Sequence, residues 1–302
     1  MEEKPAPFIG VKVINDFRWP PHVCDDMIEE LRKFKVRDDD VFIVTYPKSG
    51  SHWMTDVTKN IVCGGDLEKV KEYGNHGPPI EFYNFFKKCD IFPKDKPRVL
   101  MTHVPVDILP KEVFEGKGKV VYVVRNPKDT AVSFWHFVKE RRFLEEYEKW
   151  DNFLAAYLKP DMMCGSWFDF NLKYYEHRDA KNFLFITYEE MKLDHKGCVI
   201  QLSDFFSRHL TDDQVDLIVN NTTFSNMKSK FTGKRNTKHL GDVPKLGVVG
   251  ASNQKFTIMR KGVVGDWKTH FTVAQNELFD EIYSEKMKRS SLRRRIIFEI
   301  DA

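Results

Sequence analysis

The sequence lacks the features that mark a membrane, secreted or metal-binding chain. No apolar run approaches the roughly 18 residues that a membrane-spanning helix needs. The five cysteines form no C-x-x-C pair, which indicates free thiols in a reducing compartment and not a disulfide framework or a zinc site. The first residues are charged and lack the apolar centre of a secretory signal. We therefore expect a cytoplasmic protein that binds no metal ion and does not span a membrane.

Charge of one sign and repetition are also scarce. A net charge of +3 over 302 residues disfavours a nucleic-acid-binding module, although the run Lys286–Arg295 is basic. Such a run is more typical of the solvated face of a final helix. We find no internal repeat, low-complexity stretch or linker, so we expect one domain over residues 1–302.

Four short apolar runs predict buried parallel strands, with helical patterns between and after them. The strand segments are Val41–Tyr46, Arg98–Thr102, Lys119–Arg125 and Phe183–Tyr188, and the helical segments are Ser51–Cys63, Lys128–Arg142, Trp150–Tyr157, Cys198–Ser207 and Val273–Lys288. This alternation predicts an α/β fold in which helices flank a central parallel sheet. Ligands bind beyond the carboxyl ends of the strands in such sheets, so we expect the chemistry there. The polar stretch from Lys228 to Gly265 is predicted to be a long functional loop.

An anion-binding loop follows the first predicted strand. A turn at Gly50, the hydroxyls of Ser49 and Ser51, and the charge of Lys48 precede a helix, whose N-terminus favours a phosphate. The loop is not a Walker A motif, because Lys48 precedes the glycine and no acidic strand end offers a magnesium ligand. A P-loop kinase or NTPase is therefore disfavoured but remains an alternative, as does a catalytically silent nucleotide-binding protein.

Three segments resemble those of the cytosolic sulfotransferases. Thr45–Trp53 (TYPKSGSHW) is similar to the family's 5′-phosphosulfate loop, with Ser51 where threonine is usual. Val120–Ser133 (VVYVVRNPKDTAVS) is similar to its 3′-phosphate segment, and Arg260–Lys268 (RKGVVGDWK) to its R-K-G-x-x-G-D-W-K element. The matches run in the family's order from about residue 41 to 277. They imply a phosphate loop like that of P-loop NTPases after the first core strand.

The resemblance implies a PAPS-dependent sulfotransferase. The sulfuryl group of PAPS would pass to a hydroxyl of a small apolar acceptor (a phenol, a sterol or another alcohol) or to an amine, leaving PAP without help from a metal. His103, in the segment Met101–Val104, is implied to be the general base, and an ordinary histidine pKa near 6.5 suits that task. Lys48 would stabilise the leaving group. Ser133, which we expect near the start of the following helix, where an anion is favoured, would hold Lys48 away when no acceptor is bound. Met101 stands where some members carry a lysine.

The remaining site residues are likewise implied by the resemblance. The nucleotide site would comprise Lys48, Ser49, Gly50, Ser51, His52, Trp53, Arg125, Ser133, Tyr188, Thr222, Phe224, Met227, Ile258, Met259, Arg260, Lys261 and Gly262. Ile258 stands where many members have phenylalanine. The acceptor site would be formed by Phe82, His103, Phe137 and Trp167. Lys268, Thr272, Val273 and Glu277 match the family's K-x-x-x-T-V-x-x-x-E dimerisation motif, which implies a homodimer.

Overall fold

A four-stranded parallel sheet forms the centre of the computed structural model, which describes residues 10–20, 23, 25–73, 79–81, 96–141, 143–160, 162–232 and 259–300. The strands are β3 (Val41–Thr45), β4 (Val99–Thr102), β5 (Lys119–Val124) and β6 (Phe183–Thr187), in the order β4-β3-β5-β6. Each neighbouring pair is parallel. The predicted fold class is confirmed, and every strand boundary lies within one residue of the expected one.

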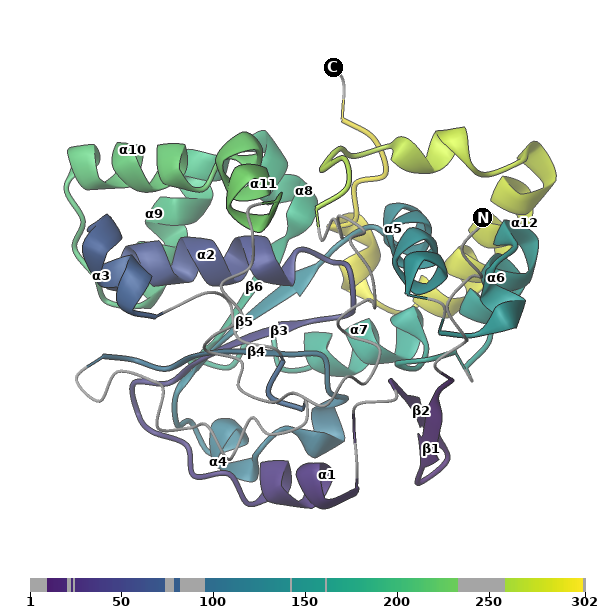
Figure 1. Ribbon diagram of the computed structural model, residues 1–302, viewed down its shortest axis with the longest axis horizontal. Helices are drawn as coiled ribbons and strands as arrows, with labels where there is room; N and C mark the ends of the chain where they lie inside the picture. The colour runs from purple at the N-terminus through teal and green to yellow at the C-terminus, as the bar shows by residue number, and fades with distance from the viewer. Residues whose placement is uncertain are drawn as a thin grey trace, which may run out of the picture.

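Both faces of the sheet are covered by helices, as its continuous apolar strands predict. Val41 and Ile43 point to one face and pack with helices α2 (Ser51–Val62) and α9 (His195–Phe205). Phe42 and Val44 point to the other, where α1 (Asp25–Arg32), α4 (Lys111–Phe114) and α7 (Trp167–Tyr175) lie. Figure 1 shows these two layers above and below the strands. Successive strand residues alternate between the two cores because the side-chain period is two.

The other helices extend these layers. They are α3 (Leu67–Glu72), α5 (Pro127–Glu140), α6 (Trp150–Tyr157), α8 (Tyr188–Leu193), α10 (Asp212–Asn221), α11 (Phe224–Thr232) and α12 (Val273–Met287), and a hairpin joins β1 (Lys12–Ile14) to β2 (Phe17–Trp19). Helices α5, α6 and α12 lie together near the carboxyl ends of the strands (Figure 1). Buried Lys128 of α5 pairs with Asp280 of α12 at 2.5 Å, and Trp150 of α6 donates to Gln275 at 3.1 Å.

The helix predictions differ from the structure mainly at helix ends. The segment Trp150–Tyr157 is confirmed at both ends. The helix expected from Cys198 begins three residues earlier, because the side chain of Asp194 accepts the N–H of Gly197 and caps it. The predicted loop from Lys228 is wrong at its start, since α11 continues to Thr232. Residues 233–258 of that loop lie outside the described residues.

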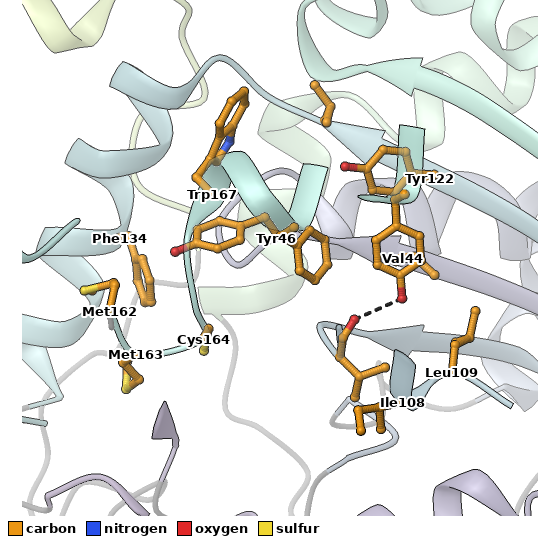
Figure 2. Packing of buried hydrophobic residues seen from close by; sticks show 14 of the residues in the cluster. Val44, Tyr46, Ile108, Leu109, Tyr122, Phe134, Met162, Met163, Cys164 and Trp167 are labelled. Atoms are coloured by element: carbon orange, nitrogen blue, oxygen red, sulfur yellow. Dashed lines mark hydrogen bonds between the residues drawn. The ribbon is translucent and has the colours of Figure 1, made fainter. Parts of the chain in front are cut away.

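An aromatic core supports the loop that follows β3. Tyr46 packs edge-on against Phe134 of α5 with ring centroids 6.0 Å apart (Figure 2). Its hydroxyl donates to the carbonyl of Gly165 at 2.9 Å. Cys164 beside it is a buried free thiol, as are Cys63 and Cys198. Within the described part of the chain, no helix has both the length and the apolar character that crossing a bilayer requires.

Candidate active site

The backbone between β3 and α2 turns sharply around Lys48. Lys48 has a φ of 69° and Gly50 a φ of 106°, and this left-handed region costs a non-glycine residue on the order of 1 kcal/mol. A Cβ on Gly50 would lie 2.9 Å from Cδ2 of Tyr188, so only glycine fits there. Ser49 is buried, and its Oγ makes no hydrogen bond to any described residue. The turn thus has the strain and the unused donor of a loop built for an anion.

The Lys48 ammonium lies close to an aromatic ring and is influenced by the positive charge of Arg125. Its Nζ is 4.7 Å from the centroid of the Phe137 ring on α5, so the predicted leaving-group residue and a predicted acceptor residue are neighbours. Burial, and secondarily the positive charge of Arg125, lower the pKa of Lys48 to about 8. Lys48 therefore remains charged at neutral pH but sits close to its titration range.

His103 follows β4, next to the end of β3. Its Nδ1 lies 2.8 Å from the carbonyl oxygen of Thr45 and 3.2 Å from Thr45 Oγ1. A carbonyl only accepts, so Nδ1 carries the proton and the lone pair of a neutral imidazole resides on Nε2. Burial, and secondarily the charge of Lys48, lower the pKa of His103 to about 4, against the opposing effect of the Thr45 bond. The ring is therefore neutral at pH 7 and able to accept a proton.

Arg125 directly follows β5, the strand on the other side of β3. Its guanidinium is held by carbonyl oxygens, with Nη2 donating to Val263 at 3.0 Å and Nη1 to Lys48 at 3.4 Å. It stacks 4.4 Å above the ring of Tyr188. The Nε is buried without a hydrogen bond among the described residues. The Nη2 atom lies 3.9 Å from Oδ2 of Asp129. A fixed guanidinium with an unused donor suits a phosphate oxygen.

Ser133 does not lie where the sequence suggested. The expectation that it stands near a helix start is wrong, because it is the seventh residue of α5, which begins at Pro127. Pro127 occupies the first turn after Asn126, whose side chain caps the helix at Asp129. Ser133 therefore gains little from the helix dipole, which acts within the first turn.

Arg260 and Lys261 share one carboxylate. Asp266 is buried and accepts from the guanidinium of Arg260 and from Lys261 Nζ, the latter at 2.6 Å. Burial raises the pKa of Asp266, but the hydrogen bonds from both cations outweigh it, so the net shift is downward. Fully buried Asp129 holds the same turn by accepting the backbone N–H of Gly265 at 2.8 Å. Asp266 thus holds the cations of Arg260 and Lys261 close together, in the turn that Arg125 contacts through Val263.

Gly262 brings this turn against α11. A Cβ at Gly262, whose φ is 69°, would lie 2.2 Å from Cε2 of Phe224. The segment with Arg260 and the segment with Phe224 are therefore in direct contact, although Gly262 and Phe224 lie 38 positions apart along the chain.

A group of aromatic rings lies beside the anion loop. Trp53 on α2 packs edge-on against Tyr188, with centroids 5.4 Å apart, and its Nε1 donates to the carbonyl of Thr222 at 2.9 Å. His195, which sequence reasoning missed, packs against Trp53 at 5.2 Å and bonds Thr222 Oγ1 at 3.1 Å. Because Thr222 Oγ1 donates to the carbonyl of Ile218, His195 Nε2 must be the donor. These rings could sandwich a planar base.

For the other predicted nucleotide and acceptor residues, the structure mainly shows burial and position in the fold. Met227 is fully buried and Met259 partly so, while Ser51 and His52 begin α2. Trp167 is fully buried at the start of α7, and its indole Nε1 has no hydrogen bond to a described residue. Phe82 and Ile258 lie outside the described residues.

The predicted dimer segment starts α12. Thr272 caps the helix, in a reciprocal pair with Gln275, and Val273 is 76% exposed. Lys268 pairs with Glu299 of the same chain at 2.6 Å. Thr272 and Glu277 are exposed. The segment is thus an accessible helix end with one unusually exposed valine.

The residues that sequence reasoning missed are held by contacts across the chain. Glu81 accepts the backbone N–H of His103, His195 supports Thr222, and Asp266 binds Arg260 and Lys261. Glutamate and histidine are common residues, and no local pattern marks Glu81 or His195. A carboxylate five residues after two adjacent cations was the one available signal, for Asp266.

The arrangement fits a doubly phosphorylated purine nucleotide. Lys48, Arg125, Arg260 and Lys261 supply positive charge at the carboxyl end of the sheet, and the aromatic rings lie on the side of α2. Buried donors of Ser49, Arg125 and Arg260 remain without hydrogen-bond partners among the described residues. The described residues include no cluster of three or more His, Cys, Asp or Glu side chains that could hold a metal ion.

Comparison with known proteins identifies the same kind of chain. A family model described as "Sulfotransferase domain" matches residues 38–291. An amine sulfotransferase of Oryctolagus cuniculus is 36% identical over 88% of this chain and 87% of its own length. A 3-alpha-hydroxysteroid sulfotransferase of Cavia porcellus is 34% identical over 88% of this chain and 91% of its own. The crystal structure of mouse sulfotransferase SULT7A1 complexed with PAP superposes with a TM-score of 0.76, at 34% identity, over 94% of this chain and 96% of that one.

Proposed function

The chain belongs to the sulfotransferase family and is a PAPS-dependent sulfotransferase, and we propose that His103 and Lys48 carry its chemistry. One observation carries this proposal. The two residues follow the adjacent strands β3 and β4, and Thr45 at the end of β3 accepts the Nδ1 proton of His103. The neutral Nε2 and the charged Nζ are thus the base and the cation of one site.

His103 would take the proton of the acceptor hydroxyl as its oxygen bonds to sulfur. The bond between sulfur and the bridging oxygen breaks, and Lys48 stabilises the negative charge on that oxygen as PAP leaves. The low pKa of His103 keeps it unprotonated at neutral pH, so it is always ready to accept. Positioning and fixed charge supply most of the rate, as in phosphoryl transfer.

We propose that the nucleotide is held by the remaining cations and rings. Ser49, Gly50 and Ser51 would bind the 5′-phosphate through the loop and the N-terminus of α2. Arg125, Arg260 and Lys261 would bind the 3′-phosphate, with Ser133 contributing from α5. Support comes from the buried donors of Ser49, Arg125 and Arg260, which have no hydrogen-bond partner among the described residues. Trp53, Tyr188, Thr222, Phe224 and Met227 would enclose the purine, as their mutual contacts suggest.

We propose a small apolar acceptor that offers a hydroxyl. Phe137 stands beside Lys48 and Trp167 is part of the aromatic core behind the loop, which supports an apolar acceptor. The relatives named above act on amines and on hydroxysteroids, so phenols, sterols, other alcohols and amines all belong in the assay. We further propose a cytoplasmic homodimer formed through Lys268–Glu277.

The proposal is tested with labelled PAPS and a panel of these acceptors. Sulfated product names the acceptor class. With that acceptor, His103→Ala should lower kcat by about 10²- to 10⁴-fold, the usual contribution of a general base, and Lys48→Met should do likewise. PAP affinity by calorimetry should change little for His103→Ala. The matched control is His209→Ala, which removes an exposed imidazole. Unchanged turnover of His103→Ala would refute the base assignment.

A further inference from the structure

The buried carboxylate of Glu81 accepts a hydrogen bond from the backbone of the predicted base, His103. The segment 79–81 runs beside the edge strand β4, where Ile80 N–H donates to the carbonyl of Met101 at 2.9 Å. Glu81 then reaches the end of β4. Its Oε2 accepts from Thr102 Oγ1 at 2.8 Å, and its Oε1 accepts from the backbone N–H of His103 at 3.0 Å. Glu81 is only 4% exposed.

These bonds determine how the chain leaves β4. Thr102 Oγ1 donates to Glu81 and also accepts the backbone N–H of Val104 at 3.3 Å. Glu81 therefore holds the backbone N–H of His103 directly, and it holds the N–H of Val104 indirectly, through Thr102. Thr45 holds the imidazole ring from the opposite strand. The direction of Nε2 is thus set by one contact on the ring and one on the backbone.

We propose that Glu81 is a positioning residue for His103, which holds the turn at His103 so that Nε2 faces the acceptor hydroxyl. This inference rests on the proposed role of His103 as the base. Glu81 acts through the backbone and touches neither the nucleotide cations nor the loop at Lys48. Misplacing a catalytic group by about 1 Å can cost on the order of 10²-fold in rate, so a backbone anchor at the base has a direct catalytic consequence.

The electrostatics of Glu81 agree with this geometry. Both of its partners are donors, so the ionised carboxylate suits the two bonds. Burial nevertheless raises the pKa of Glu81 to about 7. The charged or titratable groups facing it are Cys164 and Tyr174, whose pKa values are raised first by burial and then by the charge of Glu81, and the neutral His103. Burying a carboxylate in such surroundings costs free energy. A loop can be held in place without that cost, so the buried charge favours a functional role for Glu81.

The experiment compares Glu81→Met, Glu81→Gln and Glu112→Gln. Methionine keeps the length of the side chain and removes both acceptors, while glutamine retains an oxygen for the His103 N–H. Glu112 is the matched control, because it also accepts a backbone N–H, from Val36 at 3.0 Å, but on α4 away from the site. We expect kcat to fall about 10-fold or more in Glu81→Met and less in Glu81→Gln. PAP affinity and the KM for PAPS should stay within about twofold, and Glu112→Gln should keep wild-type kcat.

The decisive readout is the same substitution in a His103→Ala background. If Glu81 acts through His103, Glu81→Met should cause no further loss of kcat there, since residues that act as a unit are strongly non-additive. A full additional loss would show that Glu81 acts elsewhere, and wild-type kcat in Glu81→Met would also overturn the inference. A parallel loss of PAP affinity would assign Glu81 to general structure. If Glu81→Met does not fold, Glu81→Gln carries the same comparison. If His103→Ala alone keeps its turnover, the proposed function fails instead.

Discussion

The Nδ1 of His103 lies 2.8 Å from the carbonyl oxygen of Thr45, at the end of the neighbouring strand. This contact selects the tautomer that leaves Nε2 unprotonated, and it couples the predicted base to the strand that leads into the Lys48 loop. Base and cation therefore keep a constant separation only while β3 and β4 stay paired.

As pH falls, the activity should first decrease because Glu81 gains a proton, and only at lower pH because His103 does. Burial raises the pKa of Glu81 to about 7, so its carboxylate gains a proton as pH falls through 7, whereas His103 stays neutral down to about 4. We expect kcat/KM to fall through about pH 7 to a lower plateau and to fall again near 4. Glu81→Gln, which mimics the protonated carboxyl, should stay at that plateau between pH 5 and 7. A wild-type profile that is flat through pH 7 would contradict this expectation.

The alkaline side should report Lys48. With a pKa lowered to about 8 by burial and by Arg125, Lys48 loses its charge as pH rises through 8, and the free enzyme loses its leaving-group cation. We expect kcat/KM to decline there. In Lys48→Arg the absolute rate should drop, but the decline near pH 8 should vanish, because arginine stays protonated. An identical alkaline limb in both proteins would assign it to another group.

Gly50→Ala should weaken nucleotide binding by about 10-fold or more. The new Cβ must displace the ring of Tyr188, which it would approach to 2.9 Å. The control is Gly116→Ala, where φ is 98°, close to the 106° of Gly50, but a Cβ would meet nothing within 4 Å. Both variants bear the strain of a left-handed alanine, on the order of 1 kcal/mol. PAP calorimetry should separate them, and equal affinities would show that Tyr188 does not contact the nucleotide.

Glu189→Gln should change how stability depends on pH. Glu189 is fully buried, and burial raises its pKa to about 7, above the 4.5 of an exposed carboxyl. The folded state therefore binds more protons between these values, and this contribution to stability is lost as pH rises towards 7. Relative to Glu189→Gln, the wild type should lose up to about 3 kcal/mol between pH 5 and 8.

Urea unfolding of both proteins at the two pH values measures this difference. The glutamine oxygen can still accept from Asn126 N–H, which Glu189 binds at 2.9 Å. Glu176→Gln, on an exposed carboxylate, is the control for loss of one negative charge. A difference between wild type and Glu189→Gln that does not vary with pH would mean that Glu189 titrates normally.

Val273→Glu should abolish the proposed homodimer. Val273 is 76% exposed in the single chain, and an unpaired carboxylate buried at its place in a two-fold contact would be costly. Light scattering at micromolar concentration should show a dimer for the wild type and a monomer for the variant. Val13→Glu, at a valine that is 65% exposed on β1, should remain dimeric. A monomeric wild type would refute the dimer itself.

The strand–loop–helix unit of the anion site was predictable because its signals are local. The apolar run before Pro47, the glycine at position 50 and the helical pattern after it act over a few residues. Ser133 shows the limit of such reasoning, because the helix predicted from Lys128 begins only one residue earlier, at Pro127, and yet Ser133 lies in its second turn and not at its start. The helix at His195 likewise began earlier than its apolar pattern, since a polar cap sets it.

The sequence by itself determined the sheet, the loop at Lys48 and the kinds of residues that meet a nucleotide, because backbone preference and apolar period depend on near neighbours. Only the tertiary structure decided that Glu81 holds His103, that His195 supports Thr222 and that Asp266 binds both Arg260 and Lys261. The first two contacts join residues more than 20 positions apart, and all three depend on the directions that buried side chains take once the layers have packed. That information arises from the folded path of the chain and is present in no single stretch of it.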